Sequence, residues 1–128
     1  MKLEFIKPGG RTKIDKPIVR VSKKGTMTLN PAAGKKIEAD NFQYAAIARD
    51  PEHPDGSRLY LATYREPNDF SVKVSSNRSS YLMTVRSILK QMEIPFEEKK
   101  IEYAITEATE YEGNPLYVLE RVVFEDRG

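Results

Sequence analysis

Hydrophobic and polar residues alternate over residues 18–29, and a turn signal interrupts the alternation at its centre. Gly25 supplies the positive φ angle that a tight turn between two strands requires. The period of two on either side of this glycine is typical of half-buried strands. The pattern therefore predicts a β-hairpin. Its buried side chains are expected to be Val19, Val21, Met27 and Leu29.

Two short helices are predicted from capping residues. Asn30 followed by Pro31 is typical of a helix start, because Asn is a preferred N-cap and Pro is tolerated at the first helical position. This first helix is expected to reach Ile37. Thr84 is expected to cap a second helix that runs from residue 85 to about residue 92 and stops before Pro95.

The remaining strands follow from apolar runs bounded by Pro, Gly, Asn and Asp. Residues 42–49 and 59–64 are expected to form a hairpin with a long loop, and residues 65–69 form a break. Further strands are expected at residues 70–75, 81–83, 101–109 and 116–124. Residues 1–17 contain several Pro and Gly residues and many cations, which predicts a basic N-terminal arm.

The order of these elements occurs twice, in residues 18–64 and again in residues 70–124. Short matches accompany it, such as Arg-Val-Ser at Arg20–Ser22 and Lys-Val-Ser at Lys73–Ser75. A unit of about 50 residues buries little surface by itself. We therefore predict one β-rich α+β domain, residues 18–128. Two tandem hairpin-helix-hairpin (ββαββ) pseudo-repeats are expected to interdigitate into an intramolecular, pseudo-dimeric barrel.

Charge is distributed unevenly along the chain. The net charge of +2 combines ten Lys/Arg and two Asp/Glu in residues 1–36 (+8) with eleven Lys/Arg and seventeen Asp/Glu in residues 37–128 (−6). A cationic segment on an acidic body is typical of a surface that binds a polyanion. A solvated basic tail is the simpler alternative.

The segment from Val21 to Ile37, VSKKGTMTLNPAAGKKI, resembles the swapped-hairpin fold of AbrB-type proteins. The tandem arrangement is similar to MraZ-type proteins, in which one chain holds two such units. The second half departs from the pattern, since residues 76–80 contain no turn glycine and no proline starts its helix. The resemblance implies a transcriptional regulator that binds double-stranded DNA through basic residues of the first hairpin and helix.

The resemblance also implies the candidate contacts. In the first half these are Arg20, Lys23, Lys24, Lys35 and Lys36, and in the second half Lys73, Arg78, Arg86 and Lys90. Long cationic side chains on a hairpin reach phosphates, and Arg also pairs with guanine edges.

Other kinds of chemistry find little support. His53 is the single histidine, it lies in a loop, and we interpret it as a solvated loop residue. The chain has no cysteine and no phosphate-binding glycine motif. We expect no enzyme activity, no cofactor, no metal and no membrane span, and we expect a cytoplasmic protein.

Two alternatives stay open. Aromatic residues beside cations, Tyr60, Tyr64, Phe70 and Tyr81, are typical of sheets that bind single-stranded nucleic acid, as in PC4 and Whirly proteins. The acidic second half is also compatible with a non-enzymatic adaptor or inhibitor that binds a protein, such as one encoded by a mobile element. The sequence leaves open whether the chain forms a homo-oligomer.

Overall fold

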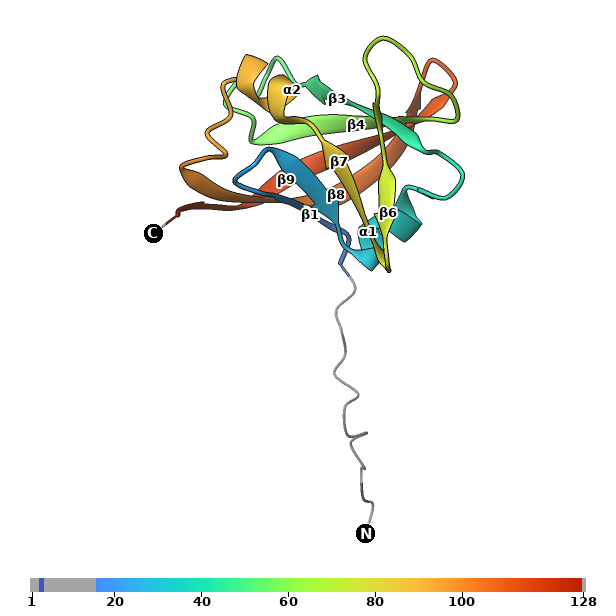
Figure 1. The fold of residues 1–128 in the computed structure, drawn as a ribbon, viewed down its shortest axis with the longest axis horizontal. Helices are drawn as coiled ribbons and strands as arrows, with labels where there is room; N and C mark the ends of the chain where they lie inside the picture. Colours follow the sequence, from blue (N-terminus) through green and yellow to red (C-terminus); the bar gives the residue numbers. More distant parts are fainter. Residues whose placement is uncertain (1–2, 4–15, 128) are drawn as a thin grey trace.

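A computed structural model describes residue 3 and residues 16–127, so the predicted arm (residues 1–17) lies almost entirely outside the described residues. The described chain forms nine strands and two short helices (Figure 1). They are β1 (Ile18–Val21), β2 (Thr26–Leu29), α1 (Pro31–Lys36), β3 (Tyr44–Arg49), β4 (Arg58–Tyr64), β5 (Val72–Lys73), β6 (Ser75–Asn77), β7 (Ser80–Thr84), α2 (Arg86–Gln91), β8 (Lys99–Tyr111) and β9 (Asn114–Asp126).

All nine strands belong to one antiparallel sheet with the order β5-β3-β4-β9-β8-β1-β2-β7-β6. The two ends of this sheet come from one short segment of chain, since β5 and β6 are separated by Val74 alone. The Val74 amide donates to the carbonyl of Gln43 (2.8 Å), while β6 pairs with β7. The sheet is thereby closed almost completely into a barrel, which removes most exposed strand edges.

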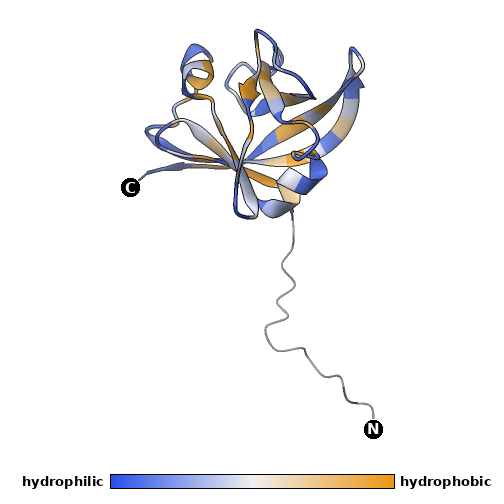
Figure 2. Ribbon diagram, turned by 45° about the vertical axis from the view of Figure 1, so that its right-hand side comes forward, coloured by the Kyte–Doolittle hydropathy of each residue, from blue (hydrophilic) through white to orange (hydrophobic). Residues whose placement is uncertain are grey.

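The prediction of a β-rich chain with two short helices is confirmed, whereas the tandem repeat stays a prediction. The alternation of residues 18–29 also corresponds to a hairpin with one buried face, as predicted. The four expected side chains are buried, with at most 4% of their surface exposed. Figure 2 shows hydrophilic residues gathered in the turns and at the end of β9. The largest buried side chains are those of Tyr103, Phe96, Met27, Leu29, Ile37, Leu59, Leu61, Met83, Leu89, Ile101 and Leu119.

The first turn and the first helix form as the sequence predicts. Gly25 has a φ of 83°, and its amide donates to the carbonyl of Ser22 (3.0 Å). The Asn30 side chain accepts from the amide of Ala33 (2.8 Å), and Pro31 occupies the first turn of α1. Asn30 also accepts from the amide of Ile18 (3.1 Å), which fixes α1 at the open end of the β1–β2 hairpin.

Several boundaries in the second half differ from the prediction. The N-cap of α2 is Val85, without a side-chain capping bond, because Thr84 pairs with Thr26 in the sheet. The expected strand at residues 70–75 is divided between β5 and β6. Phe70 belongs to a turn instead, because its amide donates to the Asn68 side chain (2.9 Å).

The last hairpin is longer than predicted at both ends. Glu112 and Gly113 both have positive φ angles, 52° and 81°, as in the two-residue turns that join twisted strands. This tight turn lets pairing continue to Tyr111 and Asn114, whereas the sequence predicted a longer turn over residues 110–115. Residues 106–113 are exposed, so this end of the hairpin projects from the barrel (Figure 1). In the described part of the chain, neither helix has the length and apolar character that crossing a membrane demands.

Candidate nucleic-acid interface

Seven of the nine predicted cations fall into two groups at opposite ends of the β1–β2 hairpin. Lys23 and Lys24 lie in the turn, whereas Lys35 and Lys36 end the helix that starts at the open end of the hairpin. From Lys24 to the start of α1 the chain is extended, a separation on the order of 20 Å. The lysines of the first hairpin and helix are close in sequence, but the fold places them at two separate sites.

The first group joins the β1–β2 turn to α2. We name Lys23, Lys24, Arg86 and Lys90 the turn–α2 cluster. The amide of Val85 donates to the carbonyl of Gly25 (3.0 Å), and the Arg86 guanidinium donates to the carbonyl of Lys24 (3.4 Å). The turn and the helix thus form one cationic surface, although 62 residues separate Lys24 from Arg86.

Arg86 is oriented by three neighbours. Besides the Lys24 carbonyl, its guanidinium lies 3.9 Å from a carboxylate oxygen of Glu97 and 5.6 Å from the centroid of the Phe96 ring. These contacts limit its freedom while the side chain stays exposed. The lysines of the cluster are exposed, and within residues 16–127 they form no ion pair. They are therefore available to an external anion.

The second group joins α1 to the β6–β7 turn. We name Lys35, Lys36 and Arg78 the turn–α1 cluster. Lys35 and Ser79 line one surface hollow, and a Cβ atom at Gly34 would overlap the Tyr81 ring. Arg78 lies in that turn with a φ of 59° and is exposed.

Carboxylates accompany the turn–α1 cluster. The Tyr81 hydroxyl donates to Asp40 (2.8 Å), and this hydrogen bond raises the pKa of Tyr81 above its usual 10.0. Glu38 lines the same hollow as Lys35. The turn–α1 cluster is therefore the less basic of the two.

Arg20 and Lys73 belong to neither cluster. Arg20 lies on β1 and forms an ion pair with Glu102 across the sheet (3.4 Å). Lys73, on β5, lines a second hollow with Asp40 and Tyr81. Both side chains are exposed, but each lies beside a carboxylate.

The four aromatic residues considered for base stacking differ in exposure. Tyr60 and Tyr64 are half-buried on β4, and Tyr81 packs against α1. Phe70, in contrast, exposes 80% of its surface. The residue pattern did not distinguish Phe70, because the turn that presents it was predicted as strand.

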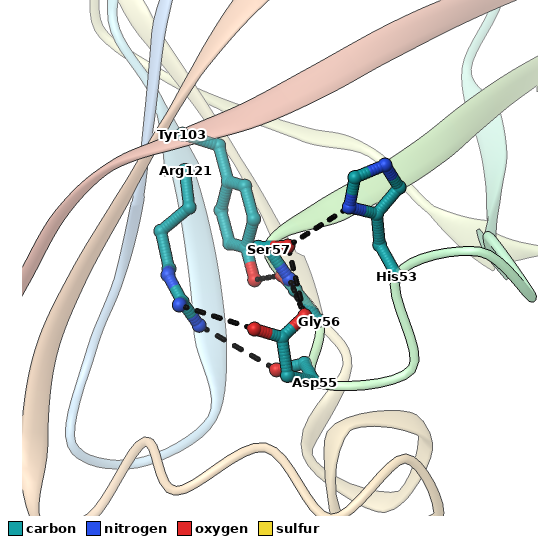
Figure 3. A network of polar contacts seen from close by, with 6 residues as sticks. All are labelled: His53, Asp55, Gly56, Ser57, Tyr103 and Arg121. Carbon is teal, nitrogen blue, oxygen red and sulfur yellow. Dashed lines mark hydrogen bonds and ion pairs between the residues drawn. The ribbon is translucent and has the colours of Figure 1, made fainter.

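A polar network lies in the β3–β4 loop (Figure 3). The Ser57 hydroxyl donates to Asp55 (2.8 Å) and lies 3.3 Å from Nδ1 of His53. The hydroxyl proton of Ser57 is directed at the Asp55 carboxylate and not at the imidazole of His53. The imidazole is therefore not placed as a base for Ser57, unlike the histidine of a nucleophilic triad.

The same loop is tied to the last hairpin. The Tyr103 hydroxyl donates to the carbonyl of Gly56 (2.7 Å), and Arg121 pairs with Asp55 (3.6 Å). Hydrogen bonds from Ser57, followed by the charge of Arg121, lower the pKa of Asp55 below 3.8. These contacts fix the loop, and His53 is half-buried within it rather than fully solvated.

Metal-ligating residues are not grouped in the part of the chain that the structure describes, where no three of His, Asp or Glu are placed to hold an ion.

Comparison of the chain with models of protein families, with curated proteins and with solved structures finds no match. The likeness to AbrB-type proteins consequently depends on residues 21–37 alone and stays a prediction.

Proposed function

We propose that the chain is a transcriptional regulator that binds double-stranded DNA through the turn–α2 and turn–α1 clusters. The observation that carries this proposal is the construction of the clusters. Each combines a hairpin turn with a helix from a distant part of the sequence, and together they hold exposed lysines that lack ion pairs among the described residues. Such cations are the groups that neutralise phosphates.

We also propose that the barrel is a pseudo-dimer of residues 18–64 and 70–124. The strand order supports this, because each hairpin of the first half lies between strands of the second half. The β1–β2 hairpin lies between β8 and β7, and the β3–β4 hairpin lies between β5 and β9. An exchange of hairpins between two ββαββ units produces this arrangement.

The equal spacing of matching helix positions in the two halves supports the same proposal. Pro31 and Arg86 start the two helices, and the positive-φ residues that follow them are Glu38 and Glu93. The number of residues from Pro31 to Arg86 equals the number from Glu38 to Glu93. Since non-Gly residues seldom adopt positive φ, two such matching positions favour a common origin for the helix ends.

The pseudo-symmetry relates the two clusters to each other. The β1–β2 turn contacts α2, and the β6–β7 turn lies beside α1. A separation on the order of 20 Å spans roughly six base pairs along a duplex. The clusters therefore contact different phosphates and fix the orientation of the barrel on DNA.

The test is fluorescence anisotropy with a labelled duplex and a labelled single strand, each at two salt concentrations. Two variants remove one cluster each: Lys23→Glu with Lys24→Glu, and Lys35→Glu with Lys36→Glu. We expect at least tenfold weaker duplex binding for the first variant and a smaller loss for the second. We also expect a salt slope that falls by about one for each lost phosphate contact.

Arg65→Glu is the control, because it changes the charge of an exposed cation that lines a separate hollow with Glu66 and Glu110. It is expected to bind DNA as the unmodified protein does, apart from the general effect of net charge. Equal losses in the control and the cluster variants would contradict a local interface. Absence of binding at low salt and micromolar protein would refute the proposal.

The projecting end of the β8–β9 hairpin favours a second candidate, a non-enzymatic adaptor or inhibitor that binds a basic protein. Glu107, Glu110 and Glu112 are exposed there, beside Tyr111 with 60% of its surface exposed. Binding of this kind would survive the lysine variants and would be lost when the three glutamates are changed to Gln.

A location in the cytoplasm follows from the proposed regulator of AbrB type. A homo-oligomer, in which two pseudo-dimers pair on one operator, is compatible with this proposal.

A further inference from the structure

Phe70 is presented to solvent by a rigid turn. Its side chain is 80% exposed. The turn is fixed by hydrogen bonds at both ends: the Phe70 amide donates to the Asn68 side chain (2.9 Å), and the Asn68 amide donates to the Ser71 hydroxyl (2.8 Å). Exposing a large aromatic side chain on an ordered turn leaves apolar surface in water, which is typical of binding sites.

A groove of about 580 Å³ lies beside this ring, between the turn and α2. Ile88 of α2 and Met92, the residue that caps its C-terminus, contribute apolar surface, and Ser87 and Gln91 contribute polar groups. Arg49 also lines the groove, and its guanidinium donates to the carbonyl of Gln91 (3.4 Å). The groove therefore combines an aromatic ring, an apolar wall and a cation held in place by the helix.

The groove and the turn–α2 cluster share one helix. Ser87 and Gln91 line the groove, while Arg86 and Lys90, each directly preceding one of them, belong to the cluster. A six-residue helix is about 9 Å long. A nucleic-acid strand whose phosphates contact Arg86 and Lys90 consequently has its bases within reach of the groove.

We propose that this groove binds an unstacked nucleobase, which stacks on Phe70 while its strand lies on the turn–α2 cluster. The inference rests on the proposed nucleic-acid binding and adds a preference for unpaired bases. Base–aromatic stacking tolerates any base, because every base has a π face. The charges favour this occupant over an apolar peptide. Arg49 and the carboxylate of Asp69 line the groove, and Arg86 and Lys90 add two further cations on α2, the helix that forms one of its walls.

The experiment uses three DNA probes that contain 2-aminopurine, whose fluorescence reports stacking. The probes are a paired duplex, the same duplex with the 2-aminopurine as a single-base bulge, and the single strand. Phe70→Ala is expected to lower the affinity for the bulge and the single strand about tenfold and to change duplex affinity less than twofold. It is also expected to remove the fluorescence change that the unmodified protein causes in the bulge.

Two further variants serve as controls. Phe70→Tyr keeps the ring and is expected to restore binding of the bulge. Tyr111→Ala removes another exposed aromatic residue, at the projecting end of the β8–β9 hairpin, and is expected to change none of the affinities. Far-UV circular dichroism of each variant checks the fold. We expect no change, because the substituted side chains are exposed and contribute little to the core.

Each outcome separates the two proposals. Unchanged bulge affinity in Phe70→Ala, with duplex binding still lost in the Lys23→Glu, Lys24→Glu variant, would overturn the base site, keep the DNA-binding proposal and leave the groove to a protein partner. Equal losses for duplex and bulge would also overturn it, since Phe70 would then contact paired DNA. If the unmodified protein bound none of the probes, both proposals would fail.

Discussion

Gly25 and Arg86 are in direct contact, although they belong to distant parts of the sequence: a Cβ atom on Gly25 would lie 2.6 Å from the Cβ atom of Arg86. The glycine also has a φ of 83°, which L-residues with a side chain rarely adopt. The absence of a side chain at Gly25 therefore lets the first turn approach α2 and brings the cations of the turn–α2 cluster together.

Gly25→Ala is expected to destabilise the protein by about 3 kcal/mol, because backbone strain adds to steric overlap with Arg86. Urea unfolding followed by circular dichroism measures the loss. Gly113→Ala is the matched control, since Gly113 has a similar φ of 81° and a Cβ atom there would meet no atom of a non-adjacent described residue within 4 Å. Its cost is expected to be about 1 kcal/mol. Equal losses would mean that the contact with Arg86 adds nothing.

Asn30→Ala is expected to lower the free energy of unfolding by about 2 kcal/mol, because an N-cap and further hydrogen bonds are lost together. The side chain accepts from the amides of Ala33 (2.8 Å) and Ile18 (3.1 Å) and donates to the carbonyl of Lys16 (2.7 Å). Asn30→Asp keeps both acceptors and is expected to recover most of the stability in thermal or urea unfolding. An alanine variant as stable as the aspartate variant would show that capping is unimportant here.

Thr63→Val is expected to stabilise the protein by about 1 kcal/mol, because it removes the desolvation penalty of a buried polar group without a partner. Thr63 is fully buried on β4, and its hydroxyl has no hydrogen-bond partner among residues 16–127. The methyl group that replaces the hydroxyl is of similar size. Differential scanning calorimetry measures the change, and the exposed Thr84→Val serves as the reference for β propensity. A lower melting temperature for Thr63→Val would indicate that the hydroxyl is hydrogen-bonded in solution.

The buried hydroxyl of Tyr103 is expected to make the stability of the protein depend on pH in the alkaline range. Burial raises the pKa of its hydroxyl from 10.0 to about 12. Between these values the unfolded chain loses the proton and the folded chain keeps it, so the free energy of unfolding decreases as pH rises. The contribution is complete below pH 10 and decreases by about 1.4 kcal/mol per pH unit above it.

Comparison with Tyr103→Phe isolates this effect from other titrating groups. At neutral pH the variant is expected to be about 1 kcal/mol less stable, because the Gly56 carbonyl loses its donor. Urea unfolding at several pH values is expected to show the two stability curves crossing between pH 10 and 12. Parallel curves over this range would contradict the burial of an ionisable hydroxyl at this position.

Local features of the fold were predictable from the sequence. Gly25, Asn30 and Pro31 specify a turn and a helix start through their own backbone preferences, and the structure has both. The failures at Thr84 and Phe70 share a cause. In both cases another residue overrides a local propensity. Thr84 pairs with Thr26 across the sheet instead of capping the helix, and Phe70 lies in a turn that a hydrogen bond to the Asn68 side chain fixes.

Contacts between distant segments were not predictable. The alternation around Val19 is compatible with any partner strand, and nothing in it specifies pairing with Tyr103. The candidate site shows the same limit. Nine cations were identified, but the division of seven of them into two clusters depends on which hairpin turn meets which helix. Lys24 and Arg86 are joined by a contact that leaves no signature in either segment.

The position of β9 between β4 and β8 determines when the barrel can form during synthesis. Translation completes β4 at Tyr64, but its partner is finished only at Asp126, roughly 3–12 s later at typical elongation rates. Throughout this interval the nascent chain exposes an unpaired strand edge, which is a template for pairing with other chains. Pairing of β9 with β4 is thus the event that ends this period of aggregation risk.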